Sequence, residues 1–144
     1  MTAPAAPHEP SDLLIRRVLE DCQVWAVVGL SANESRAAFG VARFLQSHGK
    51  QIVPVHPKAD TVHGERGYPT LADIPFDVDC VDVFVRSELA GGVADEAIAI
   101  GAAAVWFQLG VIDREAAARV TDAGLDMVMD RCPAIEWPRL GPAA

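Results

Sequence analysis

A short polar stretch, residues 29–36, combines the residue types that bind phosphate in a strand-to-helix turn. Gly29 follows the apolar run at 24–28, small polar residues come next, and Arg36 stands where a helical pattern begins. Glycine lets the backbone approach a ligand closely, and the free N–H groups and dipole of a helix start favour an anion. The stretch is therefore a candidate phosphate-binding loop.

Three further cations, Lys58, Arg86 and Arg131, follow later apolar runs in the same way. The chain has a formal net charge of −8, so the positions of its cations, and not their number, can indicate a site for an anion. Gathered with Arg36, they would form a local positive site, which suits a ligand with several phosphates. The alternative for each arginine is an ion pair with a neighbouring acid in a polar loop.

Residues that could act as nucleophiles are few, and none has an evident base. Cys132 stands beside Arg131, and His56 is the one base that could approach it across a sheet edge. Ser31 and Ser35 are the other candidates. The histidines and acids show no metal-ligand spacing. We therefore expect no catalytic site and no metal site, and a buried position at a strand end for Cys132.

Alternating strand and helix patterns position these residues. The expected strands are 24–28, 51–55, 80–85, 103–107 and 126–129, and the expected helices are 11–22, 36–48, 88–100 and 113–123, with a short helical turn at 70–74. This alternation is typical of a Rossmann-like, doubly wound parallel sheet in three layers, α/β/α. We expect the strand order 3-2-1-4-5, with its reversal beside the first strand. Residues 11–140 would form a single domain between flexible tails at 1–10 and 141–144.

The apolar patterns also predict which side chains are buried. The near-continuous apolar run at 24–28 suits a strand that is covered on both faces. Trp25 and Trp106 fall in strand positions and are expected in the core. The residues expected on the inward face of the helix at 88–100 are Leu89, Val93, Ala97 and Ile100.

In a sheet of this kind, ligands bind outside the carboxyl ends of the strands, where the strand order reverses. The residues that follow the strands should therefore meet at one edge. In chain order they are Gly29, Ser31, Asn33, Ser35 and Arg36, then His56, Pro57 and Lys58, then Arg86 and Ser87, then Gln108 and Gly110, then Asp130, Arg131 and Cys132.

The loop does not fit an ordinary dinucleotide site. The G-x-G-x-x-G fingerprint needs three glycines, and Ser31 and Glu34 stand in place of the second and third. The ribose of NAD also requires an acid after the second strand, where this chain has His56-Pro57-Lys58. A cation there suits a phosphorylated ribose, as in NADP or coenzyme A.

Composition narrows the class of protein further. The net charge of −8 disfavours non-specific binding to nucleic acid or to an acidic membrane surface. Three cysteines without zinc-site spacing predict free thiols in a reducing cytoplasm. The first ten residues lack the apolar core of a secretory signal, and no apolar run approaches the roughly 18 residues of a membrane span.

A series of motifs resembles the small stand-alone CoA-binding proteins, which are similar to the N-terminal CoA-binding domain of the succinyl-CoA synthetase alpha subunit. The resemblance covers about residues 12–140. The motifs are Val27-Val28-Gly29-Leu30-Ser31, Ser35-Arg36, Val53-Pro54-Val55-His56-Pro57-Lys58, Tyr68-Pro69-Thr70-Leu71, Val81-Asp82-Val83-Phe84-Val85-Arg86, Val105-Trp106-Phe107-Gln108-Leu109-Gly110 and Met129-Asp130-Arg131-Cys132.

The resemblance implies a Rossmann-like fold that binds coenzyme A or a short acyl-CoA. It implies phosphate contacts in the first loop, a phosphate near the ribose for Lys58, adenine or ribose contacts around Phe84, and the pantetheine arm or diphosphate near Gln108. The chain departs from the family pattern in two motifs: His56 replaces an asparagine, and Val85-Arg86-Ser87-Glu88 replaces Arg-Arg-Pro-Glu. The full set of expected cofactor contacts is Gly29, Leu30, Ser31, Asn33, Arg36, His56, Pro57, Lys58, Phe84, Val85, Arg86, Gln108, Gly110 and Arg131.

Three functions remain open from the sequence. The first is a non-catalytic binding or regulatory module for CoA, acting as a monomer or small homo-oligomer. The second is an NADP- or CoA-dependent enzyme, for which Cys132 would be the candidate nucleophile. The third is an interaction scaffold with a degenerate nucleotide site. The synthetases carry a catalytic histidine on a second domain that is not found in this chain, which favours the first function.

Overall fold

The computed structural model describes residues 10–142, so residues 1–9 of the expected N-terminal tail and residues 143–144 of the expected C-terminal tail lie outside it. The five strands are β1 (Val24–Val28), β2 (Gln51–Val55), β3 (Cys80–Val83), β4 (Ala104–Phe107) and β5 (Asp126–Val128). The helices are α1 (Asp12–Asp21), α2 (Ala37–Ser47), α3 (Ser87–Ala99), α4 (Arg114–Asp122) and α5 (Pro133–Leu140), with a 3-10 turn η1 (Leu71–Asp73).

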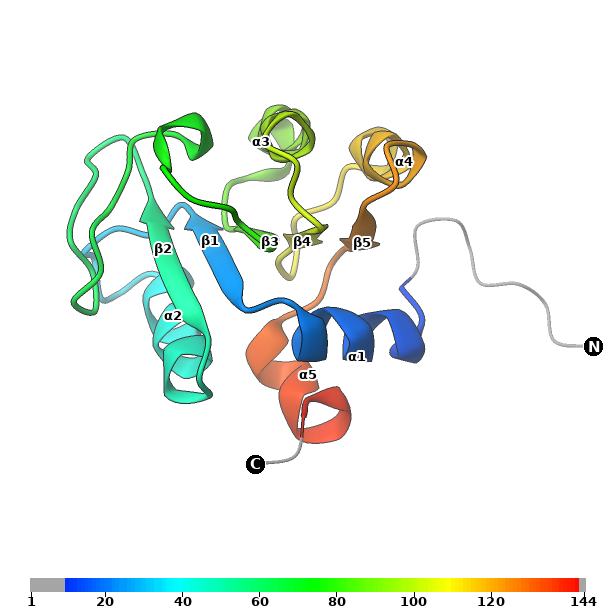
Figure 1. Cartoon of the computed structure of the whole chain (residues 1–144), viewed down its shortest axis with the longest axis horizontal. Helices are drawn as coiled ribbons and strands as arrows, with labels where there is room; N and C mark the ends of the chain where they lie inside the picture. The colour runs from blue at the N-terminus through cyan, green and yellow to red at the C-terminus, as the bar shows by residue number, and fades with distance from the viewer. Residues whose placement is uncertain (1–9, 143–144) are drawn as a thin grey trace, which may run out of the picture.

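All neighbouring strands are parallel, and helices cover both faces of the sheet. Figure 1 shows α3 and α4 on one face and α1, α2 and α5 on the other. Two apolar clusters fill the space between these layers. The predicted three-layer α/β class is therefore confirmed.

The predicted strand order is wrong. The observed order is β2-β1-β3-β4-β5, so β1 lies between β2 and β3 and the reversal falls between β1 and β3. Pro54 explains why β2 is not an interior strand, because proline has no N–H to give a second neighbour. The chain covers this edge instead with the loop after β2, where the Tyr68 N–H donates to the carbonyl of Pro54.

The buried face of α3 also differs from its prediction. Ala90, Ala94 and Ala97 are the buried residues of this helix, and Leu89 is 51% exposed. Ala97 is buried as predicted, whereas Ala90 and Ala94 take the buried positions expected for Leu89 and Val93, so the helix packs through small residues. Leu89 lies instead at the carboxyl end of the sheet. Trp25 and Trp106 are fully buried as predicted, with ring centroids 5.8 Å apart.

The last helix, α5, is not among the elements expected from the sequence, and it contains Pro133 and Pro138. Pro133 occupies the first helical turn, where its missing N–H costs nothing and its fixed φ favours the helix. The helix packs against α1 and α2, on the face of the sheet that these two helices cover, through Trp137 and Leu140. No helix among residues 10–142 is long and apolar enough to cross a membrane.

Candidate functional site

A cleft of about 600 Å³ opens at the carboxyl ends of β1, β2 and β3, next to the reversal of strand order. Its lining residues come from the loops after these strands and from the first turns of α2 and α3. They are Gly29, Ser31, Arg36, Ala37, Ala38, His56, Pro57, Phe84, Val85, Arg86 and Leu89. The charged side chains of this lining are the two arginines, and no acid is among the described residues that line it.

Gly29 occupies a position that requires glycine. Its φ is +102°, and its N–H donates to the Val55 carbonyl at 2.8 Å. A Cβ at this residue would lie 2.9 Å from the carbonyl oxygen of Phe84, closer than packed atoms allow. Gly29 therefore lets the loop after β1 pass directly against the loop after β3, and these two loops form the cleft.

The rest of the first loop is held by its own side chains. The Asn33 carboxamide oxygen accepts from the Ser35 N–H at 3.0 Å and from the Ser35 hydroxyl at 2.6 Å. The hydroxyl of Ser31 accepts from the Asn33 N–H at 3.2 Å. Asn33 and Ser35 thus stabilise the loop conformation, while Ser31 lines the cleft.

The two helices that start at the cleft lack side-chain caps. Arg36 precedes α2 and Arg86 precedes α3, and neither makes a capping hydrogen bond. By contrast, Ser11 caps α1 and Asp113 caps α4. An uncapped helix start leaves free N–H groups and the positive end of the helix dipole, so both helix starts at the cleft are suited to an anion.

His56 and Lys58 form the side of the cleft that follows β2. The Lys58 N–H donates to His56 Nδ1 at 3.1 Å, so the neutral imidazole carries its proton on Nε2 and can donate from there. His56 lines the cleft, whereas the Lys58 side chain is exposed outside the lining. The flexible four-carbon stem of Lys58 gives its ammonium reach from this position.

Besides Lys58, five predicted contacts lie outside the cleft lining. Leu30 is fully buried in the core, and Asn33 stabilises the first loop. Gln108 is buried, the Gly110 N–H donates to the Asp130 carboxylate at 2.8 Å, and the Arg131 side chain lies 3.6 Å from Glu136. The last three follow β4 and β5, which the observed strand order separates from β1 by β3.

Three lining residues were not predicted: Ala37, Ala38 and Leu89. The two alanines supply the small side chains and backbone of the first turn of α2. Both could have been predicted from the sequence, because they begin the helix that follows the loop after Gly29. Leu89 was expected inside the core, and its place in the cleft follows from the alanine face of α3.

Asp82 is a buried acid that takes no part in the cleft. It lies within β3, and neither of its carboxylate oxygens has a hydrogen-bond partner among the described residues. Burial raises the pKa of the Asp82 carboxyl well above its ordinary value, which favours the protonated form. Cys132 is buried at the end of β5 as predicted, and residues 10–142 contain no group of three potential metal-ligating side chains.

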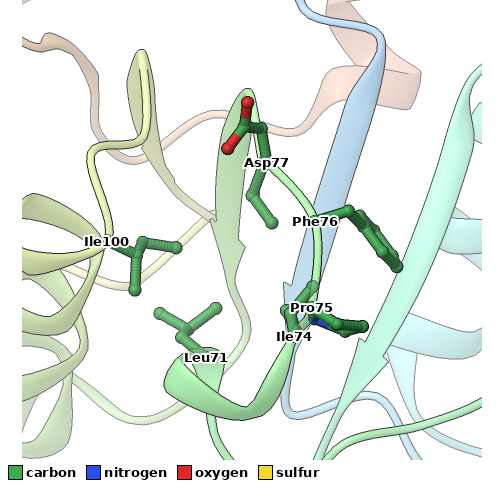
Figure 2. Close-up of a pocket in the computed structure, with 7 residues that line it drawn as sticks. Leu71, Ile74, Pro75, Phe76, Asp77 and Ile100 are labelled. Atoms are coloured by element: carbon green, nitrogen blue, oxygen red, sulfur yellow. The ribbon is translucent and has the colours of Figure 1, made fainter.

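Two other hollows lie at the opposite end of the sheet. One, of about 370 Å³, lies between η1 and the end of α3, and Figure 2 shows Leu71 and Ile100 facing each other while the Asp77 carboxylate points away. The other, of about 1010 Å³, is bordered by the ends of α1, α2 and α5 and contains buried Lys50. A cation there complements the negative ends of these helices, so we assign Lys50 a structural role.

Known proteins share this architecture. The family described as "CoA binding domain" matches residues 23–138. The uncharacterised protein YneT of Bacillus subtilis is 35% identical over 125 residues, which are 87% of this chain and 93% of that protein. The structure of a hypothetical protein from Pyrococcus horikoshii OT3 is 36% identical with a TM-score of 0.88, over 97% of this chain and 99% of that chain.

A larger relative is similar over part of this chain. The ADP-forming acetate–CoA ligase of Methanocaldococcus jannaschii is 25% identical over 71 residues, which are 49% of this chain and 10% of the ligase. The similarity is therefore to one small region of a much longer enzyme.

Proposed function

Because this chain belongs to the CoA-binding domain family, we propose that it binds coenzyme A or a short acyl-CoA in the cleft at the carboxyl ends of β1, β2 and β3. The proposed role is that of a binding or regulatory module rather than a catalyst. The lining supplies cations, a hydroxyl and backbone N–H groups, and among the described residues no hydrogen bond joins the Ser31 hydroxyl to His56.

The observation that carries this proposal is the pair of uncapped helix starts that face an acid-free cleft. Arg36 and Arg86 add two guanidinium groups to the two positive helix ends. Phosphates satisfy such N–H groups and pair with arginine in a bidentate manner. Arg86 also forms an exposed ion pair with Glu88, with its Nε 3.8 Å from Oε2, so it contributes less positive potential than Arg36. The two helix starts and the two arginines together suit a ligand with several phosphates, as coenzyme A has.

We assign roles to the surrounding residues on the same basis. The loop that begins at Gly29 and the start of α2 would hold the diphosphate. Lys58, with the Nε2–H of His56, would face the ribose phosphate. The apolar surface of Phe84 and Val85 would carry the adenine, and Leu89 would border the apolar part of the ligand.

The proposed compartment is the cytoplasm. All three cysteines are free and buried, which suits a reducing environment. The net charge of −8 makes nucleic acid an unsuitable partner.

A thermal-shift panel of CoA, acetyl-CoA, NADP, NAD and ATP tests the proposal. A ligand at a hundredfold excess over its Kd stabilises the folded state by roughly 2.7 kcal/mol, which raises the melting temperature of a chain of this size by roughly 5–10 °C. We expect CoA and acetyl-CoA to give this shift. A shift with NADP alone would refute the CoA assignment, and no shift with any of the five would favour the scaffold alternative.

A pair of variants tests the location. Arg36→Ala should weaken CoA binding about tenfold, the effect expected when one charge-assisted contact to phosphate is lost. Arg43→Ala is the matched control, because Arg43 lies on the same helix, bonds Gln46 and does not line the cleft. Equal losses in the two variants would show that the effect is one of overall charge.

A further inference from the structure

Asp60 connects the two loops that form the phosphate side of the cleft. Its carboxylate oxygen Oδ2 accepts from the N–H of Ala32 at 3.1 Å. Ala32 belongs to the loop after β1, and Asp60 belongs to the loop after β2 that also carries His56 and Lys58. This hydrogen bond therefore joins the proposed diphosphate loop to the segment that would face the ribose phosphate.

The loop after β2 is rigid enough for Asp60 to act as an anchor. Gly67 packs against its backbone so closely that a Cβ there would lie 2.2 Å from the Asp60 carbonyl oxygen. Val62 pairs with Glu65 in an antiparallel bridge. His63 Nε2 lies 2.8 Å from the Phe39 carbonyl of α2, so it donates to that oxygen and fixes the loop to the helix.

The first loop has no comparable attachment of its own at Ala32. Its internal hydrogen bonds run among Ser31, Asn33 and Ser35, and Ala32 is exposed. The carboxylate of Asp60 is thus the contact that sets the position of this amide relative to the other wall of the cleft. A carboxylate beside a phosphate site also repels the phosphate. Its presence there is explained if Asp60 holds the loop in position.

We propose that Asp60 is a positioning residue for the phosphates of coenzyme A, acting by fixing the Ala32 amide and, through it, the loop of residues 29–36. This inference rests on the proposed function. Asp60 acts through geometry: binding of the ligand requires its oxygen as a hydrogen-bond acceptor for Ala32 and does not require its negative charge.

Two substitutions separate the oxygen from the charge. Asp60→Asn keeps a side-chain oxygen that can accept from Ala32 and removes the charge, so it should bind CoA at least as tightly as the wild type. Asp60→Ala removes the oxygen and should weaken CoA binding about tenfold, the effect of one lost hydrogen bond. Asp73→Ala is the matched control, because the Asp73 carboxylate accepts from the Thr70 hydroxyl at 2.8 Å, away from the cleft. It should leave CoA binding unchanged.

A second readout excludes a merely structural effect. With the loops uncoupled, Asp60→Ala should lose part of the preference for CoA over 3′-dephospho-CoA, whereas a simple loss of stability lowers the melting temperature and leaves that ratio unchanged. Tighter CoA binding by Asp60→Ala would show that Asp60 obstructs the site, and equal binding by all variants would show that it has no role. Equal weakening by Asp60→Asn and Asp60→Ala would show that the charge is required, and each of these three results overturns the proposal.

The failure of the proposed function can be distinguished from the failure of this inference. Amide hydrogen exchange of Ala32 measures the contact without any ligand. We expect faster exchange in Asp60→Ala than in Asp60→Asn, and equal rates would overturn the role of the contact. If the wild type binds no CoA but the exchange rates differ as expected, the contact exists and only the ligand assignment has failed.

Discussion

Replacing Gly29 by alanine tests whether close contact between the loop after β1 and the loop after β3 shapes the cleft. The added methyl carbon would lie 2.9 Å from the carbonyl oxygen and 3.2 Å from the Cβ of Phe84, and the residue would have to keep a φ of +102°. The backbone strain costs about 1–3 kcal/mol. The overlap with a buried backbone adds about 1–3 kcal/mol, so the expected loss is roughly 2–6 kcal/mol in the free energy of unfolding.

Gly101→Ala is the matched control. Gly101 also has a positive φ, +76°, but no atom lies within 4 Å of the position its Cβ would take. This variant should therefore lose only the conformational part, about 1 kcal/mol. Urea unfolding of both variants gives the two free energies, and the difference between them isolates the overlap with Phe84.

The same pair of variants links the contact to function. If the methyl group separates the two loops, Gly29→Ala should bind CoA more weakly at temperatures where it remains folded, and Gly101→Ala should bind normally. Equal losses of stability in the two variants, or unchanged CoA binding by Gly29→Ala, would refute the reasoning that this close approach builds the cleft.

Two further predictions concern single side chains. Lys58→Ala should weaken CoA binding several-fold, roughly 1 kcal/mol for one exposed charge pair, and should affect 3′-dephospho-CoA less; equal losses for the two ligands, measured by calorimetry, would remove Lys58 from the ribose phosphate. Asp82→Asn should flatten the pH dependence of stability. Burial raises the pKa of the Asp82 carboxyl in the folded state, so the unfolded chain releases this proton first. Through this group the wild type loses stability as the pH rises from the unfolded pKa of about 3.9 to the raised folded-state pKa, by up to about 1.4 kcal/mol per pH unit between the two. Urea unfolding at pH 5 and pH 7 should show a smaller loss for Asp82→Asn than for the wild type, and identical slopes would mean that Asp82 is not protonated in the folded state.

The order of elements was predictable because it depends on local patterns. Continuous apolar runs marked the buried strands, and glycines such as Gly49 and Gly101, both with positive φ, ended the helices where expected. Strand pairing depends on contacts that are distant in sequence, and the prediction of the order failed. Pro54 was the residue that could have predicted the position of β2, since a strand that contains proline belongs at an edge of the sheet.

The error in strand order also explains why some predicted residues lie outside the cleft lining. An order with β4 beside β1 would bring Gln108 and Gly110 to the cleft, whereas the observed order places β3 beside β1, so Phe84, Val85 and Arg86 line the cleft and Gln108 and Gly110 do not. The positions of Arg36 and Arg86 were predictable because both follow predicted strands of the sheet. The contact of Asp60 with Ala32 had no signal in the sequence, because it depends on how the irregular loop after β2 packs against the loop after β1.

Mapping of CoA on the full chain by amide chemical shifts tests the central claim most directly. We predict saturable shifts for Gly29, Ser31 and Arg36 and for the residues around Phe84, with no shifts at Leu71 and Ile100 in the hollow at the opposite end of the sheet. Shifts confined to that hollow, or no saturable shift anywhere, would contradict the assignment of this cleft to coenzyme A.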